Sequence, residues 1–108
     1  MATHADEMPI LDLLTGMTAS SLEASNLDSR TLMLVRIAAL VAVDAPPASY
    51  VMNMRAAGES GVSADEVQDV LAAVAPIVGT TRVVSAGGKM VRALGLKSAL
   101  GELDDGGD

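Results

Sequence analysis

The sequence has 108 residues, half of them hydrophobic, and carries a net charge of −7. It contains no cysteine, which excludes disulfides, thiolate metal sites and a cysteine nucleophile within this chain. Four acids and no base lie in residues 1–24, and four more acids lie in residues 98–108, so the acidity is concentrated at the ends. The remaining body is close to neutral, and we expect no nucleic-acid partner because phosphate binding needs a basic surface.

The length predicts a single domain over residues 1–108, with flexible acidic ends at about 1–8 and 104–108. The longest apolar run, residues 32–43, is interrupted by Arg36 and is shorter than the roughly 20 residues that span a bilayer. The first residues include acids where a secretion signal has bases. We therefore expect a cytoplasmic protein that does not associate with a membrane.

The first half of the sequence predicts two helices. Pro9 suits the first turn of a helix over about 9–23, whose apolar residues then follow helical spacing. Asp28 is a good N-cap for a second helix that ends near Asp44. This second segment is apolar on nearly all sides, which is typical of a central helix. A buried strand is the alternative, and a length of about 15 residues favours the helix.

The second half predicts three more helices. Two prolines at 46 and 47 break the chain, and a third helix follows over about 47–60 until Gly61 stops it. Ser63 and Glu66 have the spacing of a capping box, and Pro76 is expected to end or kink the fourth helix. A last helix begins after Gly79 and is expected to stop at Gly95, and the glycine pair at 87–88 suits a close approach of another backbone. The fold class is therefore all-α.

Residues 27–96 resemble the carboxymuconolactone decarboxylase and alkylhydroperoxidase D family. The similar pieces are LDSRTLMLVRIAALVAV, a break and a helix, and then GVSADEVQDVLAAVAPIVGTTRVVSA. The Gly-Val-Ser-x-x-Glu-Val turn is the most recognisable of them. The resemblance implies a bundle of about five to six helices that assembles into homo-trimers or hexamers, with active sites near subunit contacts.

In the peroxidase branch of that family, a Cys-x-x-Cys pair and a His four residues later precede this turn. Counting back from Gly61 places the two cysteines at Pro46 and Ser49 and the histidine at Asn53. Asn does not exchange a proton at neutral pH as His does. The thiol chemistry that the resemblance implies therefore has no residues to carry it here.

Pro46, Ser49 and Asn53 are three and four residues apart, so they share one face of the third helix. The ligand-binding candidates are Ser49, Asn53, the single aromatic Tyr50, and Arg36 from the central helix. The alternatives are a polar face at a subunit contact, a core position for Tyr50, a backbone hydrogen bond for Asn53 and an ion pair for Arg36. Met52 and Met54 either form an adaptable pocket wall or fill the core.

Arg82, Lys89 and Arg92 follow helical spacing on the last helix and form a basic stripe with Ser85. The stripe is either a solvated helix face, an anion-binding site or a docking strip for acidic residues of a neighbour. Asp65, Glu66 and Asp69 cluster at a helix start, where the helix dipole already accounts for them. We infer no metal site and no cofactor.

Three functions remain open from the sequence. The leading hypothesis is a homo-oligomer that resembles this family, lacks its cysteine chemistry and binds a small organic molecule or acts as an accessory protein. The second is a cysteine-free enzyme that acts on a lactone or a small carboxylic acid. The third is a structural or interaction module without a small-molecule site.

Overall fold

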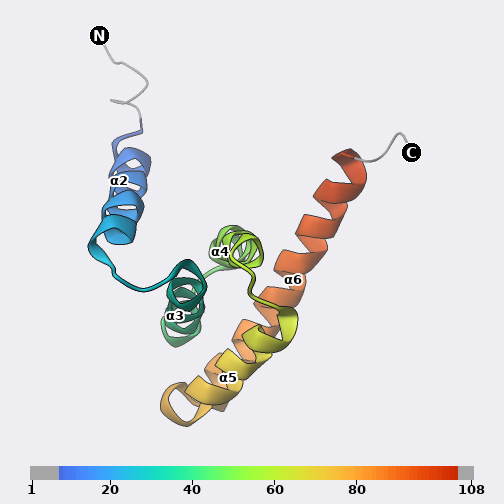
Figure 1. Cartoon of the computed structure of the whole chain (residues 1–108). Coiled ribbons are helices and arrows are strands. Elements are labelled where there is room, and N and C mark those ends of the chain that lie inside the picture. The colour runs from blue at the N-terminus through green and yellow to red at the C-terminus, as the bar shows by residue number, and fades with distance from the viewer. Residues whose placement is uncertain (1–7, 105–108) are drawn as a thin grey trace.

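The computed structural model describes the backbone of residues 8–104 and the side chains of residues 8–94. Five helices follow one another along the described chain, with no strand between them (Figure 1): α2 (Pro9–Ala24), α3 (Ser29–Ala42), α4 (Pro47–Glu59), α5 (Ala64–Val78) and α6 (Thr80–Asp104). The prediction of an all-α fold is confirmed. The flexible ends expected at 1–8 and 104–108 lie outside the described residues, except for Met8 and Asp104.

Helix α3 is the centre of the bundle, as its apolar sequence predicts. It packs against α4, α5 and α6, and α6 also packs against α4 and α5. Met33, Ile37 and Val41 are spaced four apart on one side of α3, and the last two are fully buried. From α6, Ala86, Met90 and Ala93 complete the core at the same kind of spacing.

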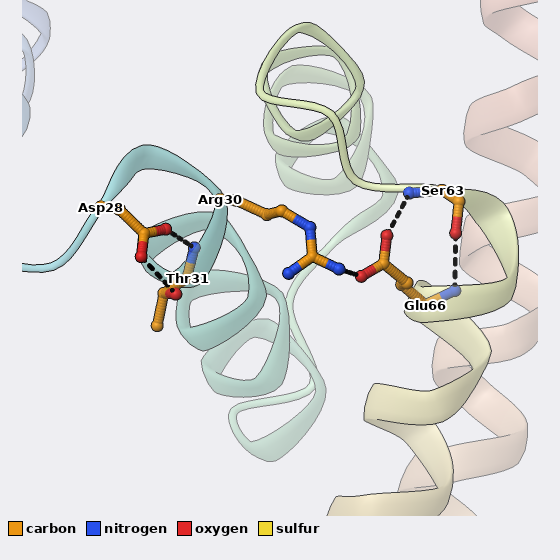
Figure 2. Close-up of polar contacts among 5 residues, drawn as sticks. All are labelled: Asp28, Arg30, Thr31, Ser63 and Glu66. Carbon is orange, nitrogen blue, oxygen red and sulfur yellow. Dashed lines mark hydrogen bonds and ion pairs between the residues drawn. The ribbon is translucent and has the colours of Figure 1, made fainter.

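Side chains close the N-terminal ends of α3 and α5. The Asp28 carboxylate accepts a hydrogen bond from the Thr31 backbone N–H at 2.8 Å, and this bond lowers the pKa of Asp28. At α5, the Glu66 N–H donates to Ser63 Oγ at 3.1 Å while the Ser63 N–H donates to the Glu66 carboxylate at 3.0 Å. These two bonds confirm the predicted capping box. Figure 2 shows that Glu66 also forms an ion pair with Arg30 of α3, and this ion pair joins the two helices.

The C-terminal ends of α3 and α4 use the same motif with different residues. In each, a residue with positive φ follows the helix: Asp44 (φ 53°) after α3 and Gly61 (φ 85°) after α4. The next N–H then returns to a carbonyl five residues back, from Ala45 to Leu40 and from Val62 to Ala57. Glycine adopts this conformation freely, whereas Asp44 holds it as one of the few other residue types that tolerate it.

The expected end of the last helix is wrong. Helix α6 does not stop at Gly95 but continues to Asp104, because the residues on both sides of this glycine are mostly good helix formers. Helix α5 ends at Val78, two residues after Pro76, so the end expected near this proline agrees with the structure. Among the described residues of the chain, nothing lies within 4 Å of a Cβ added at Gly87 or Gly88, so no other helix of the same chain approaches the glycine pair closely.

Helix α2 lies apart from the bundle. Within the described residues it packs against none of the other helices, and none of its residues is buried. In Figure 1 it extends away from α3 on the side opposite α6. One polar contact ties it to the bundle, from Arg36 Nη2 of α3 to Ser21 Oγ at 3.1 Å.

Candidate functional site

A groove of about 240 Å³ lies where α4, the first half of α5 and the middle of α6 meet. We call it the α4–α5–α6 groove. Its lining comprises Met54, Ala64, Val67, Gln68, Leu71, Gly87, Met90, Val91 and Leu94. A smaller groove of about 170 Å³ adjoins it and shares Met54, Ala64, Val67 and Leu94.

The local sequence explains why this groove stays open. Val67 and Leu71 are four residues apart on α5, and Gly87, Met90 and Leu94 lie along one side of α6. At Gly87 the missing side chain leaves space where most other residues would fill the hollow. Gly87 therefore adds no side chain to the part of the groove that it lines.

The chemistry of the groove is apolar with a single polar side chain. Gln68 supplies one amide, which can donate and accept hydrogen bonds, and no charged residue lines the wall. Met54 and Met90 are flexible and polarizable, so they can adapt to the shape of a ligand. Such a site suits an uncharged, mostly apolar molecule, because a charge placed there would lose its hydration without gaining a partner.

The predicted ligand-binding residues of α4 lie outside the two grooves. Asn53 donates from Nδ2 to the Ser49 backbone carbonyl at 2.8 Å, which is the backbone bond that the sequence left open as an alternative. Tyr50 is fully buried in the core, and its hydroxyl has no hydrogen-bond partner among the described residues. Burial raises the pKa of Tyr50, and the nearby Asp44 carboxylate raises it further.

Arg36 is half-buried, and it does not form the expected ion pair among the described residues. Its partner is the Ser21 hydroxyl of α2, and no acid contacts it among the described residues. A hydroxyl satisfies one donor of the guanidinium, and water reaches the rest because the side chain is only partly covered. Arg36 therefore holds α2 to α3 and lies in neither groove.

Two residues of the basic stripe of α6, Arg82 and Lys89, cap the C-terminal end of α3. Arg82 donates to the Ala42 carbonyl at 2.9 Å, and Lys89 donates to both the Asp44 carbonyl (3.2 Å) and the Asp44 carboxylate (2.8 Å). Ser85 Oγ donates to the same carboxylate at 2.8 Å. Positive charge is favourable at this end of a helix, where carbonyls lack partners. The stripe thus docks on an acid of its own chain.

The bonds from Lys89 and Ser85 lower the pKa of Asp44. Because Arg82 and Lys89 already serve this cap, an external anion would have to compete with the Ala42 carbonyl for Arg82 and with Asp44 for Lys89. Arg92 is exposed and makes no hydrogen bond or ion pair within the described part of the chain. The structure therefore separates the three anion-binding candidates into two capping residues and one exposed residue.

The described residues contain no group of three or more His, Cys, Asp or Glu side chains placed to hold a metal ion. Among the same residues, no helix combines the length and the apolar character that crossing a membrane requires.

Helices α4, α5 and α6 packed around the apolar central helix α3 define an all-α helical bundle. Residues 9–88 match the carboxymuconolactone decarboxylase family, and the chain belongs to that family. Comparison with curated proteins gave no match, and comparison with solved structures gave none. The match over residues 9–88 confirms the family resemblance that was inferred from the sequence.

Sequence reasoning missed the residues of the groove. Val67, Leu71 and Met90 follow the helical spacing of ordinary core residues, so nothing in the sequence separates groove from core. The signal that was present is Gly87, a glycine without a turn or a positive φ to require it. Met54 was considered as a pocket wall and lines both grooves, whereas Met52 is exposed.

Proposed function

We propose that this chain is a small-molecule-binding member of the carboxymuconolactone decarboxylase family without cysteine peroxidase chemistry, and that its ligand occupies the α4–α5–α6 groove. The observation that carries the proposal is a wall of apolar side chains with one amide, Gln68, and no charge. Ligand pockets are typically apolar with a few polar groups that orient the ligand.

Size and charge narrow the class of ligand. The groove volume of about 240 Å³ lies below the range typical of drug-sized ligands, so it suits a molecule of one or two small rings. The uncharged wall favours a neutral compound over a carboxylate. A neutral lactone whose carbonyl accepts a hydrogen bond from Gln68 meets both requirements.

The test uses two adjacent glycines as a matched pair. Gly87 lines the groove and Gly88 is exposed, and neither has an atom within 4 Å of an added Cβ. Gly87→Leu fills the groove, whereas Gly88→Leu places the same side chain in water. Both changes raise helix propensity, so both variants are expected to stay folded.

The measurement is the melting temperature with coumarin, a neutral aromatic lactone, and with benzoate, an aromatic acid. We expect coumarin to raise the melting temperature of the parent and of Gly88→Leu, since a ligand that binds the folded state stabilises it. Gly87→Leu should lose this shift, and benzoate should shift none of the proteins. The absence of a coumarin shift in the parent, or an equal shift in both variants, would contradict the proposal.

We also propose that the protein acts as a homo-oligomer, for which the family resemblance suggests a trimer or a hexamer. Several large apolar side chains of the described residues are at least half exposed, among them Met52, Ile77 and Val84. Association of copies would cover such side chains, and this is the observation that supports an oligomer.

A further inference from the structure

The apolar side of α2 is uncovered. Ile10, Leu13, Leu14 and Met17 are spaced three and four apart and form one face, which we call the α2 stripe. Each of these side chains is between 49 and 64 % exposed. The acids of the helix, Asp12 and Glu23, lie on the opposite face by the same periodicity.

Helix α2 needs a packing partner to persist. It has 16 residues, and the stability of such a helix in a protein comes mostly from the packing of its apolar face. Gly16 lowers its helix propensity, and Thr15 and Thr18 turn their hydroxyls back to the carbonyls of Leu11 and Leu14. Its sequence therefore does not supply the stability that the missing tertiary contacts would provide.

The same chain has one surface that matches the stripe. The α4–α5–α6 groove is apolar, open to solvent and free of charge, and the stripe is also free of charge. Packing one on the other buries no charged group, and Asp12 and Glu23 stay in water. Met54 and Met90 can adjust to the leucines of the stripe.

The α2 of the same chain is not placed to reach this groove. The bond from Arg36 to Ser21 holds the end of α2 at α3, and a link of four residues, 25–28, joins the two helices. Figure 1 shows α3 between α2 and α6, which carries one wall of the groove. Ser21 lies on the same face of α2 as the stripe, about one turn beyond Met17. A second copy that covers residues 10–17 therefore leaves the Arg36 contact in place at the end of the stripe.

We propose that α2 of one copy lies across the α4–α5–α6 groove of the next copy, so that the α2 stripe closes the groove. The inference rests on the proposed function for the role of the groove as a ligand site. Because the two surfaces differ, the contact is head-to-tail, and such a contact closes into a ring when the rotation between copies permits it. Each ligand site would then contain residues of two copies.

The absence of cysteine allows a clean cross-linking test. Met17 of the stripe and Val91 of the groove are both exposed, so Met17→Cys and Val91→Cys leave the core intact. We expect the double variant, under mild oxidation, to form covalent species larger than a dimer, with the 17–91 disulfide identified by peptide mass. Two control pairs should not form them: Thr15→Cys with Val91→Cys, and Met17→Cys with Ile77→Cys. Thr15 is off the stripe, and Ile77 is exposed outside the groove.

Three results would overturn the inference: no 17–91 disulfide, an equal yield in the control pairs, or a 17–91 disulfide confined to monomers. The last result would mean that α2 folds back on its own chain. The coumarin experiment separates this inference from the proposed function. A 17–91 link between copies without a coumarin shift in the parent would contradict the proposed function alone. A coumarin shift that needs Gly87, without the link, would contradict the inference alone.

Discussion

At the scale of single residues, Tyr50 buries a hydroxyl that has no partner among the described residues. A buried polar group without a hydrogen bond costs about 1–3 kcal/mol, whereas the ring itself fills the core between α3 and α6. We expect Tyr50→Phe to leave the free energy of unfolding unchanged or to raise it, as measured by urea denaturation. Tyr50→Ala, the control for the ring, should lose about 3–5 kcal/mol. A clear loss in Tyr50→Phe would show that a bound water or ligand satisfies the hydroxyl.

Asp44 makes the stability of the protein depend on acid. Its folded pKa is lowered by Lys89 and Ser85, so its stabilising effect is present above the ordinary carboxyl pKa of 3.8 and is lost as pH falls through the folded value. Asp44→Asn removes the charge and keeps a residue type that tolerates positive φ. We expect this variant to be less stable than the parent near neutral pH, and the difference to shrink below about pH 4.

Urea midpoints across this pH range measure the difference between parent and Asp44→Asn. Asp69→Asn is the matched control, because Asp69 makes no hydrogen bond or ion pair within the described residues. Its difference from the parent should stay small at every pH. A difference between parent and Asp44→Asn that grows as pH falls would contradict the proposed cap at the end of α3.

At the scale of the elements, the start of α5 joins a capping box to an ion pair with α3. Ser63→Ala removes the hydroxyl that accepts the Glu66 N–H, and we expect a loss of about 0.5–2 kcal/mol in the free energy of unfolding. Ser60→Ala is the control, since Ser60 ends α4 and its side chain makes no hydrogen bond among the described residues. A loss of equal size in both variants would show that the cap contributes nothing specific.

Local signals explain which elements the sequence predicted well. The starts and ends near Pro9, Asp28, Gly61 and Ser63 depend on residues within four positions, and all of them agree with the structure. The predicted end of α6 at Gly95 was wrong because one glycine does not outweigh the helix formers on both sides of it. The sequence also did not predict that α2 lies apart from the bundle. Its apolar residues have the same spacing whether they pack on their own bundle or on another copy.

The candidate site was harder to predict than the fold for a physical reason. A groove depends on which apolar residues from α4, α5 and α6 fail to meet, and this is a property of three helices together. Ser49 and Asn53 were singled out because polar residues at helical spacing suggest a site, yet Asn53 bonds the Ser49 carbonyl of its own helix. The residue pattern of one helix does not show which residues of other helices face it.

At the scale of the whole molecule, we expect a mass that is a multiple of the 10.9 kDa chain. The α2 stripe and the exposed apolar residues of the bundle leave apolar side chains in water, and association of copies would cover them. Light scattering on a size-exclusion column at micromolar concentration measures the mass. A monomer at that concentration would contradict the proposed assembly, while the resemblance to the family favours three or six copies.

The whole chain also predicts an absent reaction: the purified protein should show no thiol-dependent reduction of hydroperoxides above background. That reaction needs a thiolate to attack the peroxide oxygen and a second thiol to resolve the product, and this sequence has no cysteine. The family positions for Cys, Cys and His fall at Pro46, Ser49 and Asn53, so no single substitution has disguised the site. In the structure, the Asn53 amide is occupied by the Ser49 carbonyl and is not held ready for proton transfer.

Peroxide consumption in the presence of dithiothreitol tests this prediction against buffer and against Asn53→Ala. We expect the protein and the variant to match buffer, because Asn53 makes a helix-backbone contact and has no ionisable proton to exchange. Turnover clearly above buffer in the parent and lost in Asn53→Ala would place a catalytic site on α4 and defeat both this prediction and the proposed binding role. In the other outcome, peroxide turnover stays at buffer level while coumarin raises the melting temperature of both proteins. The ligand then binds without the α4 positions of the peroxidase branch, and the loss of the shift in Gly87→Leu places it in the α4–α5–α6 groove.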